Sequence, residues 1–119
     1  MNSFAFRIRP NVQAELAAAS AAETRGEFHT AFRHLERAHV LGQTIVTEHV
    51  RVHWRMFRFA IRNHLHPEAF GQAWRMAVAC VFTLPGIVPE GNTGGADVSG
   101  FRVMPIPPDL KRVLDAARA

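Results

Sequence analysis

The chain has 119 residues, of which 48% are hydrophobic and 20% charged, and its formal net charge is +4. This composition is typical of a globular protein and excludes a disordered tail, and the length predicts one helical domain over residues 1–119. The apolar run that begins at Met76 is broken by Pro85, so no transmembrane segment is expected. The N-terminus lacks a secretory signal pattern and Cys80 has no second cysteine to pair with, so we expect a cytoplasmic protein.

The first part of the chain predicts a helical hairpin. Pro10 suits the first turn of a helix through NVQAELAAASAAETR, and Gly26 suits its end. A second helix begins near Glu27, where apolar residues recur at steps of three and four. The small-residue pattern of residues 21–39 resembles one tetratricopeptide unit, but stacked repeats need about three copies and no second copy is present. We therefore expect hairpin packing rather than a peptide-binding solenoid.

A turn is predicted within LGQTIVTEH, because Gly42 and the β-branched residues 44–47 disfavour a helix. Thr47 is expected to cap a third helix that runs from about Glu48 to Leu65. A fourth helix is expected over residues 67–82, because Pro67 suits a first turn.

Residues 85–108, PGIVPEGNTGGADVSGFRVMPIPP, are dense in glycine and proline, and they predict an irregular loop packed on the helices. A short helix, DLKRVLDAAR, follows, and Asp109 is expected to cap it. The predicted fold class is therefore all-α. It is a helical hairpin extended to a small bundle of four main helices, with a long loop and a short C-terminal helix.

Three of the seven histidines fall within residues 36–53, ERAHVLGQTIVTEHVRVH. On one continuous helix His39 and His53 would stand roughly 21 Å apart. If the chain reverses at the predicted turn, His39 meets His49 and His53, which share one face of the next helix. Glu36, at Glu-x-x-His spacing, and Gln43 are candidates for a fourth ligand or for a hydrogen-bond partner of a ligand. The pattern predicts a three-histidine site for a divalent transition metal.

Imidazole ligands favour zinc, iron, nickel or copper over magnesium and calcium, and the pattern does not choose among the four. An enzymatic role stays open, because metal-dependent catalysis requires a free coordination position. The competing interpretation is structural. His53 shares a helix face with Val50, Phe57 and Ile61, where a hydrogen-bonded core imidazole is ordinary.

Arginines suggest a different function. Steps of four, three and four residues put four of them on one face of the third helix, namely Arg51, Arg55, Arg58 and Arg62. Guanidinium groups bind phosphate oxygens, so this arginine stripe fits a nucleic acid or another acidic or phosphate-bearing partner. Ion pairs with acids of the first helix, such as Glu15 and Glu23, explain the stripe equally well. A protein-interaction or scaffolding domain with structural histidines, and a homo-oligomer, also stay open.

The loop GNTGG consists of Gly91, Asn92, Thr93, Gly94 and Gly95. Its glycines allow backbone amides to approach an anion. It lacks the spacing and the lysine of a P-loop, so the favoured interpretation is a turn that lets MPIPP lie over the helices.

Several stretches make nearly the whole chain resemble an uncharacterised bacterial family, domain of unknown function 3703: IRP, ERAHVLGQ, HVRVHW, GNTGGADVSGF and MPIPPDL. The resemblance implies a shared fold and no particular activity. The family pattern includes the three histidines and part of the turn: His39, Gly42, Gln43, His49 and His53. This chain departs from the pattern at Glu48, where relatives carry proline, a residue that also suits a helix start.

Overall fold

The structure is a computed structural model that describes residues 3–65, 67–69, 71–72, 74–75 and 103–119. Its helices are α1 (Ser3–Thr24), α2 (Phe28–Gly42), α3 (Val46–Arg62) and α5 (Pro108–Arg118), and the described residues between 67 and 75 are helical too. No strand occurs in these ranges, so the predicted all-α fold class is confirmed. Within the same ranges, no helix combines the length and the apolarity that a membrane span needs.

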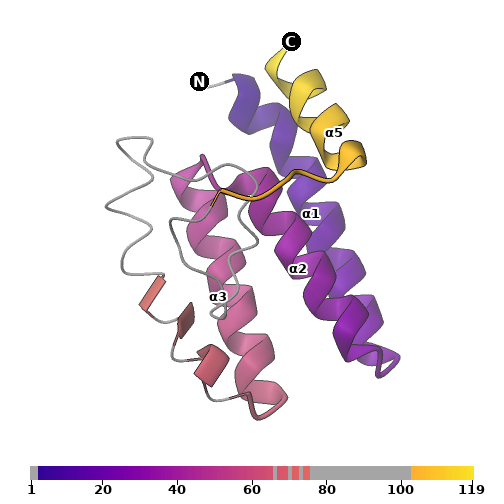
Figure 1. Cartoon of the computed structure of the whole chain (residues 1–119), viewed down its shortest axis with the longest axis vertical. Coiled ribbons are helices and arrows are strands. Elements are labelled where there is room, and N and C mark those ends of the chain that lie inside the picture. The colour runs from indigo at the N-terminus through magenta and orange to yellow at the C-terminus, as the bar shows by residue number, and fades with distance from the viewer. Residues whose placement is uncertain (1–2, 66, 70, 73, 76–102) are drawn as a thin grey trace.

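The first three helices run up and down in turn, so that α2 folds back beside α1 and α3 folds back beside α2 (Figure 1). α5 packs against the N-terminal end of α1 (Figure 1). One side-chain contact ties these two ends of the chain together, because Arg7 Nε donates a hydrogen bond to the Ala117 carbonyl over 2.7 Å. In this arrangement the end of α2 and one face of the start of α3 are buried.

Each helix contributes one apolar stripe, with members three or four residues apart, to a common core. The buried members include Ile8, Val12 and Leu16 of α1, Leu35 and Ala38 of α2, Val52 and Met56 of α3, and Leu110 and Leu114 of α5. Burial of one such large side chain stabilises the fold by about 1.5–3 kcal/mol. The core therefore fixes how the helices face one another.

The end of α1 agrees with the prediction. Gly26 adopts a φ of 77°, a left-handed conformation that glycine tolerates. The Gly26 amide donates to the Glu23 carbonyl, and the Glu27 amide donates to the Ala22 carbonyl over 2.9 Å. These two bonds form a Schellman motif, which ends the helix and starts the reversal into α2.

The predicted start of α1 was wrong. The helix begins at Ser3, and Pro10 lies inside it rather than in its first turn. Proline removes one backbone hydrogen bond from a helix interior, so packing must stabilise the turns before it. Ile8 is fully buried in the core, and Arg7 is bonded to α5.

Two predicted caps were also wrong. α3 is capped by Ile45 rather than Thr47, so Val46 and Thr47 are already helical. Ile45 packs against the core, and its carbonyl accepts a hydrogen bond from the His49 amide over 2.7 Å. α5 begins at Pro108, with Pro107 at the cap, and Asp109 lies in the first turn. In both places packing or proline geometry decides the helix start more strongly than a polar cap.

The fourth predicted helix and the long loop are tested only in part. Residues 67–69, 71–72 and 74–75 are helical, as predicted, and residues 103–107 have no regular secondary structure. The other residues of these two segments, including the GNTGG loop at 91–95, lie outside the described part of the chain.

Candidate metal centre

Three histidines from two helices meet beside the α2–α3 turn. His39 comes from the last turn of α2, and His49 and His53 come from the first two turns of α3. All three are buried, with exposed fractions of 3%, 8% and 2%. One ring nitrogen from each lies within 4.8 Å of the other two, and the ring centroids are 4.7–4.8 Å apart. The structure therefore brings together the three histidines that the sequence singled out.

Gly42 makes this approach sterically feasible. A Cβ atom at position 42 would lie 3.0 Å from Glu48 Cβ and 3.4 Å from a methyl group of Val12. A contact of 3.0 Å between carbon atoms is well inside the favourable separation of about 3.5–4.0 Å. The absence of a side chain at Gly42 lets the end of α2 lie against the first turn of α3, which sets His39 opposite His49.

The environment keeps two of the rings neutral at physiological pH. Burial, followed by the nearby His53, lowers the pKa of His49 to about 3. Burial is also the main cause that lowers the pKa of His53 to about 4; a hydrogen bond to Gln72 opposes this shift and Arg75 adds to it. Neutral imidazole is the form that binds metals, because its unprotonated nitrogen has a free lone pair.

The closest pair of nitrogens has the spacing of two metal ligands. Nε2 of His39 and Nε2 of His49 are 3.0 Å apart. In a tetrahedral site with metal–nitrogen distances of about 2.0–2.1 Å, two ligand nitrogens lie roughly 3.3 Å apart. In the metal-free molecule a single proton between the two nitrogens satisfies both of them. A metal ion would take the place of that proton after a small outward shift of the rings.

Glu36, the carboxylate candidate for a further ligand, is not in this cluster of ligand atoms. Within the described residues, the converging histidine, cysteine and carboxylate groups comprise the three histidines alone, without Glu36. Gln43 is buried and lines a cavity of about 210 Å³ next to α5, with Leu114 and Arg118 among its other walls. Among the residues that the structure describes, its side-chain oxygen Oε1 has no hydrogen-bond partner.

Gln72 contacts the cluster, and sequence reasoning did not select it. Its Oε1 is hydrogen bonded to His53 Nδ1, and its exposed fraction is 0%. The two residues are 19 positions apart and lie in different helical segments, and no motif links them. This contact depends on how the segment that contains Gln72 packs against α3, and the sequence does not reveal that packing.

The four arginines of the stripe differ in their partners, and the two outer ones form ion pairs. Arg62 forms a two-pronged ion pair with Glu23 of α1, with N–O distances of 3.0 and 2.8 Å, as the ion-pair interpretation predicts. Arg51 pairs over 3.1 Å with Glu48, a carboxylate that is only 4% exposed. Glu15, the other expected partner, bonds instead to two residues of α2, His34 and Arg37.

The two middle members of the stripe have no carboxylate partner in the described part of the chain. Arg55 donates to the Ser20 hydroxyl over 2.7 Å, and its pKa is lowered by burial and then by the neighbouring arginines. Arg58 is exposed and makes no hydrogen bond within these residues. Arg55, Arg58 and Arg62 line a cavity of about 460 Å³ together with Ser20, Glu23 and Thr24.

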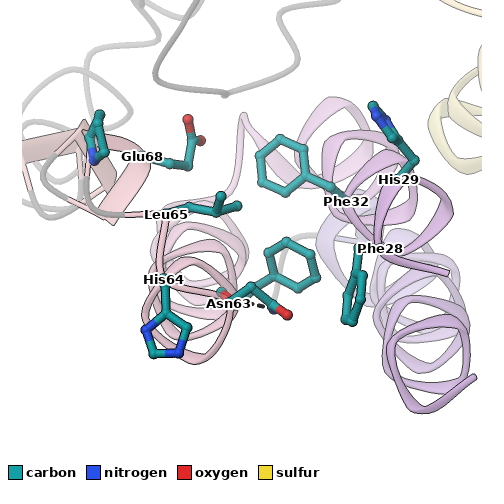
Figure 2. Close-up of a pocket in the computed structure, with 9 residues that line it drawn as sticks. Phe28, His29, Phe32, Asn63, His64, Leu65 and Glu68 are labelled. Carbon is teal, nitrogen blue, oxygen red and sulfur yellow. Dashed lines mark hydrogen bonds between the residues drawn. The ribbon is translucent and has the colours of Figure 1, made fainter. Parts of the chain in front are cut away.

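A larger apolar cavity of about 730 Å³ lies between the start of α2 and the end of α3. Figure 2 shows Phe28 and Phe32 of α2 on one side, with Leu65 and Glu68 on the other. None of the three clustered histidines lines this cavity. It is a separate feature, which no sequence motif predicted.

The fold and the cluster define a small all-α protein with three buried histidines between two helices. The family described as protein of unknown function DUF3703 matches residues 6–114, and the chain belongs to this family. The resemblance inferred from the sequence motifs is thereby confirmed. Comparisons with curated proteins and with solved structures found no match.

Proposed function

We propose that this protein binds a divalent transition metal ion through His39, His49 and His53. The observation that carries the proposal is the convergence of three buried ring nitrogens within 4.8 Å of one another. Two of these rings are neutral because burial lowers their pKa values, so neither has to lose the second proton of an imidazolium before a metal binds. Imidazole ligation favours zinc, iron, nickel or copper.

A purely structural role accounts for the cluster less well. Each buried ring has the hydrogen-bond partner that an imidazole in a core needs, because His39 and His49 bond to each other and His53 bonds to Gln72. These bonds alone do not require three histidines to lie together. Here the three rings face one another, and two of them approach through their Nε2 atoms at 3.0 Å. This arrangement gathers one ring nitrogen from each of three histidines in one place, which supports a shared ligand.

Three protein nitrogens leave one position of a tetrahedral site for a further ligand. Water in that position would be activated by the metal, which is the basis of hydrolytic metal catalysis. Metal-dependent catalysis is therefore an extension of this proposal, to be examined after a bound metal is established. The cytoplasmic location and the scaffolding alternative stay predictions.

Metal analysis of untagged protein tests the proposal. We expect close to one metal ion per chain, either as purified or after loading with zinc, iron, nickel or copper. The His49→Ala/His53→Ala double variant should lose this metal while it stays folded. A matched variant, His29→Ala/His64→Asn, also removes two histidines but leaves the cluster intact, and asparagine suits the positive φ of residue 64. Equal metal content in all three proteins, or none in any, would overturn the proposal.

A second candidate function is the binding of a phosphate-type anion in the cavity that contains Arg55 and Arg58. The observation that favours it is the crowding of guanidinium groups around Arg55, whose pKa is lowered first by burial and then by these neighbouring arginines. An oxyanion would offset this repulsion. Inorganic phosphate should shift the NMR signals of Arg55 at low ionic strength, and Arg58→Gln should abolish the shift. The Arg33→Gln variant, which changes an exposed arginine of α2, is the control. An unchanged shift in Arg58→Gln would contradict this function.

A further inference from the structure

A short chain of side chains leads from Glu68 to the histidine cluster. Nε2 of Gln72 donates a hydrogen bond to Oε1 of Glu68 over 2.7 Å, and Oε1 of Gln72 is hydrogen bonded to Nδ1 of His53. Gln72 is fully buried, so water does not compete for its amide. Glu68 also lies at the edge of the apolar cavity, which leaves it closer to solvent (Figure 2).

The chemistry of these groups fixes the direction of each hydrogen bond. A carboxylate oxygen only accepts, so the amide nitrogen of Gln72 must face Glu68. The amide oxygen therefore faces His53, and because this oxygen also only accepts, Nδ1 of His53 must carry the proton. Nε2 is then the unprotonated nitrogen of His53, with its lone pair free to bind a metal.

We infer that Glu68 and Gln72 are positioning residues that hold His53 in its Nδ1-protonated form and direct its Nε2 to the metal. This inference rests on the proposed function. Hydrogen bonds to the second nitrogen of a ligating imidazole set its tautomer and its orientation, and their loss typically lowers metal affinity 10–100-fold. Gln72 fixes the tautomer and the orientation of His53. Glu68 in turn fixes Gln72, because its hydrogen bond prevents the Gln72 amide from rotating by half a turn.

Nitrogen NMR of the full-length protein without metal tests the orientation separately from metal binding. We expect the Nδ1-protonated tautomer at His53 in the unsubstituted protein. Glu68→Ala should give a mixture of tautomers, because the amide is then free to turn. Glu27→Ala removes an exposed carboxylate at the start of α2, the end of that helix opposite to His39. This control variant should leave the tautomer of His53 unchanged. An Nε2-protonated His53 in the unsubstituted protein, or an unaffected tautomer in Glu68→Ala, would overturn the inference.

Zinc affinity then tests the consequence. Gln72→Leu fills the same space without an acceptor, and we expect it to bind zinc 10–100-fold more weakly. The Glu68→Gln/Gln72→Glu double variant exchanges the two groups, so the new amide donates to the new carboxylate, which still accepts from Nδ1. It should bind zinc within a few-fold of the unsubstituted protein. If Gln72→Leu does not fold, Glu68→Ala takes its place, with a smaller loss of affinity expected.

The two proposals fail in different ways. If the unsubstituted protein binds none of zinc, iron, nickel and copper but His53 has the expected tautomer, the proposed function fails and the orientation stands. If zinc binds with equal affinity in Gln72→Leu, Glu68→Ala and the unsubstituted protein, the function stands and the positioning role is wrong.

Discussion

Nε2 of His39 and Nε2 of His49 lie 3.0 Å apart, although they belong to different helices and ten positions separate them in the chain. The turn between α2 and α3 produces this approach, and Gly42 allows the two helices to lie close enough. His53, one turn after His49, completes the cluster. The site therefore depends on the geometry of one helix reversal.

Gly42→Ala should disturb both the fold and the site. The added methyl group would lie 3.0 Å from Glu48 Cβ, so the start of α3 must shift by a few tenths of an ångström. Overpacking of this kind typically costs about 1–3 kcal/mol of unfolding free energy. Urea denaturation measures the loss. Gly26→Asn is the control, because no heavy atom lies within 4 Å of a Cβ there and asparagine tolerates the positive φ. Equal stability of Gly42→Ala and the unsubstituted protein would show that the close approach is not required.

The metal-free protein should lose stability as the pH falls below about 6.5, the ordinary pKa of histidine. The folded-state pKa values of His49 and His53 are lowered to about 3 and about 4, so in the window between these values and 6.5 the unfolded chain binds more protons. Each histidine can then reduce the unfolding free energy by up to about 1.4 kcal/mol per pH unit. Urea denaturation at pH 7.5, 6.5 and 5.5 measures this slope.

The slope should become smaller in His49→Ala and stay unchanged in His29→Ala, because His29 is exposed. Stability that is constant or rises between pH 7.5 and 5.5 would mean that the buried histidines do not govern the pH response.

Metal binding should raise the thermal stability. A ligand that binds only the folded state adds about 2.7 kcal/mol when its free concentration is 100 times its dissociation constant. A thermal melt with and without zinc measures the difference in Tm. The His49→Ala/His53→Ala double variant should show no increase. An increase that persists in this variant would place the zinc elsewhere on the protein.

Leu110→Ala should weaken the docking of α5 on the rest of the bundle. Leu110 is 1% exposed and belongs to the common core. Truncation of a buried leucine typically costs about 2–5 kcal/mol. Hydrogen exchange should show faster exchange across α5, while Arg112→Ala, at an exposed position of the same helix, should have little effect. If only local exchange near residue 110 changes, α5 does not unfold as a unit.

The histidine cluster could be predicted from the sequence because it depends on local signals. Gly42 and the β-branched residues near it indicate a turn, and the four-residue spacing of His49 and His53 puts them on one helix face. The expected turn and the three converging rings require no knowledge of distant contacts. The structure confirms both.

Features that depend on distant packing could not be predicted. Ile45 caps α3 because it packs against the core, which outweighs the local preference for Thr47. Gln72 meets His53 across 19 positions, and its helix carries no motif that reveals which face is buried. Glu15 bonds to α2 rather than to the arginine stripe. The packing of the whole core determines which side of α1 faces α2 and which faces α3.

X-ray absorption of the zinc-loaded protein tests the central claim most directly, because it reports the atoms around the metal. We predict a first shell at about 2.0–2.1 Å and the multiple scattering of three imidazole rings. The fitted number of imidazoles should fall to one in the His49→Ala/His53→Ala double variant, or the zinc should be lost. A spectrum of zinc surrounded by oxygen ligands alone, or one that is the same in both proteins, would contradict a three-histidine metal site.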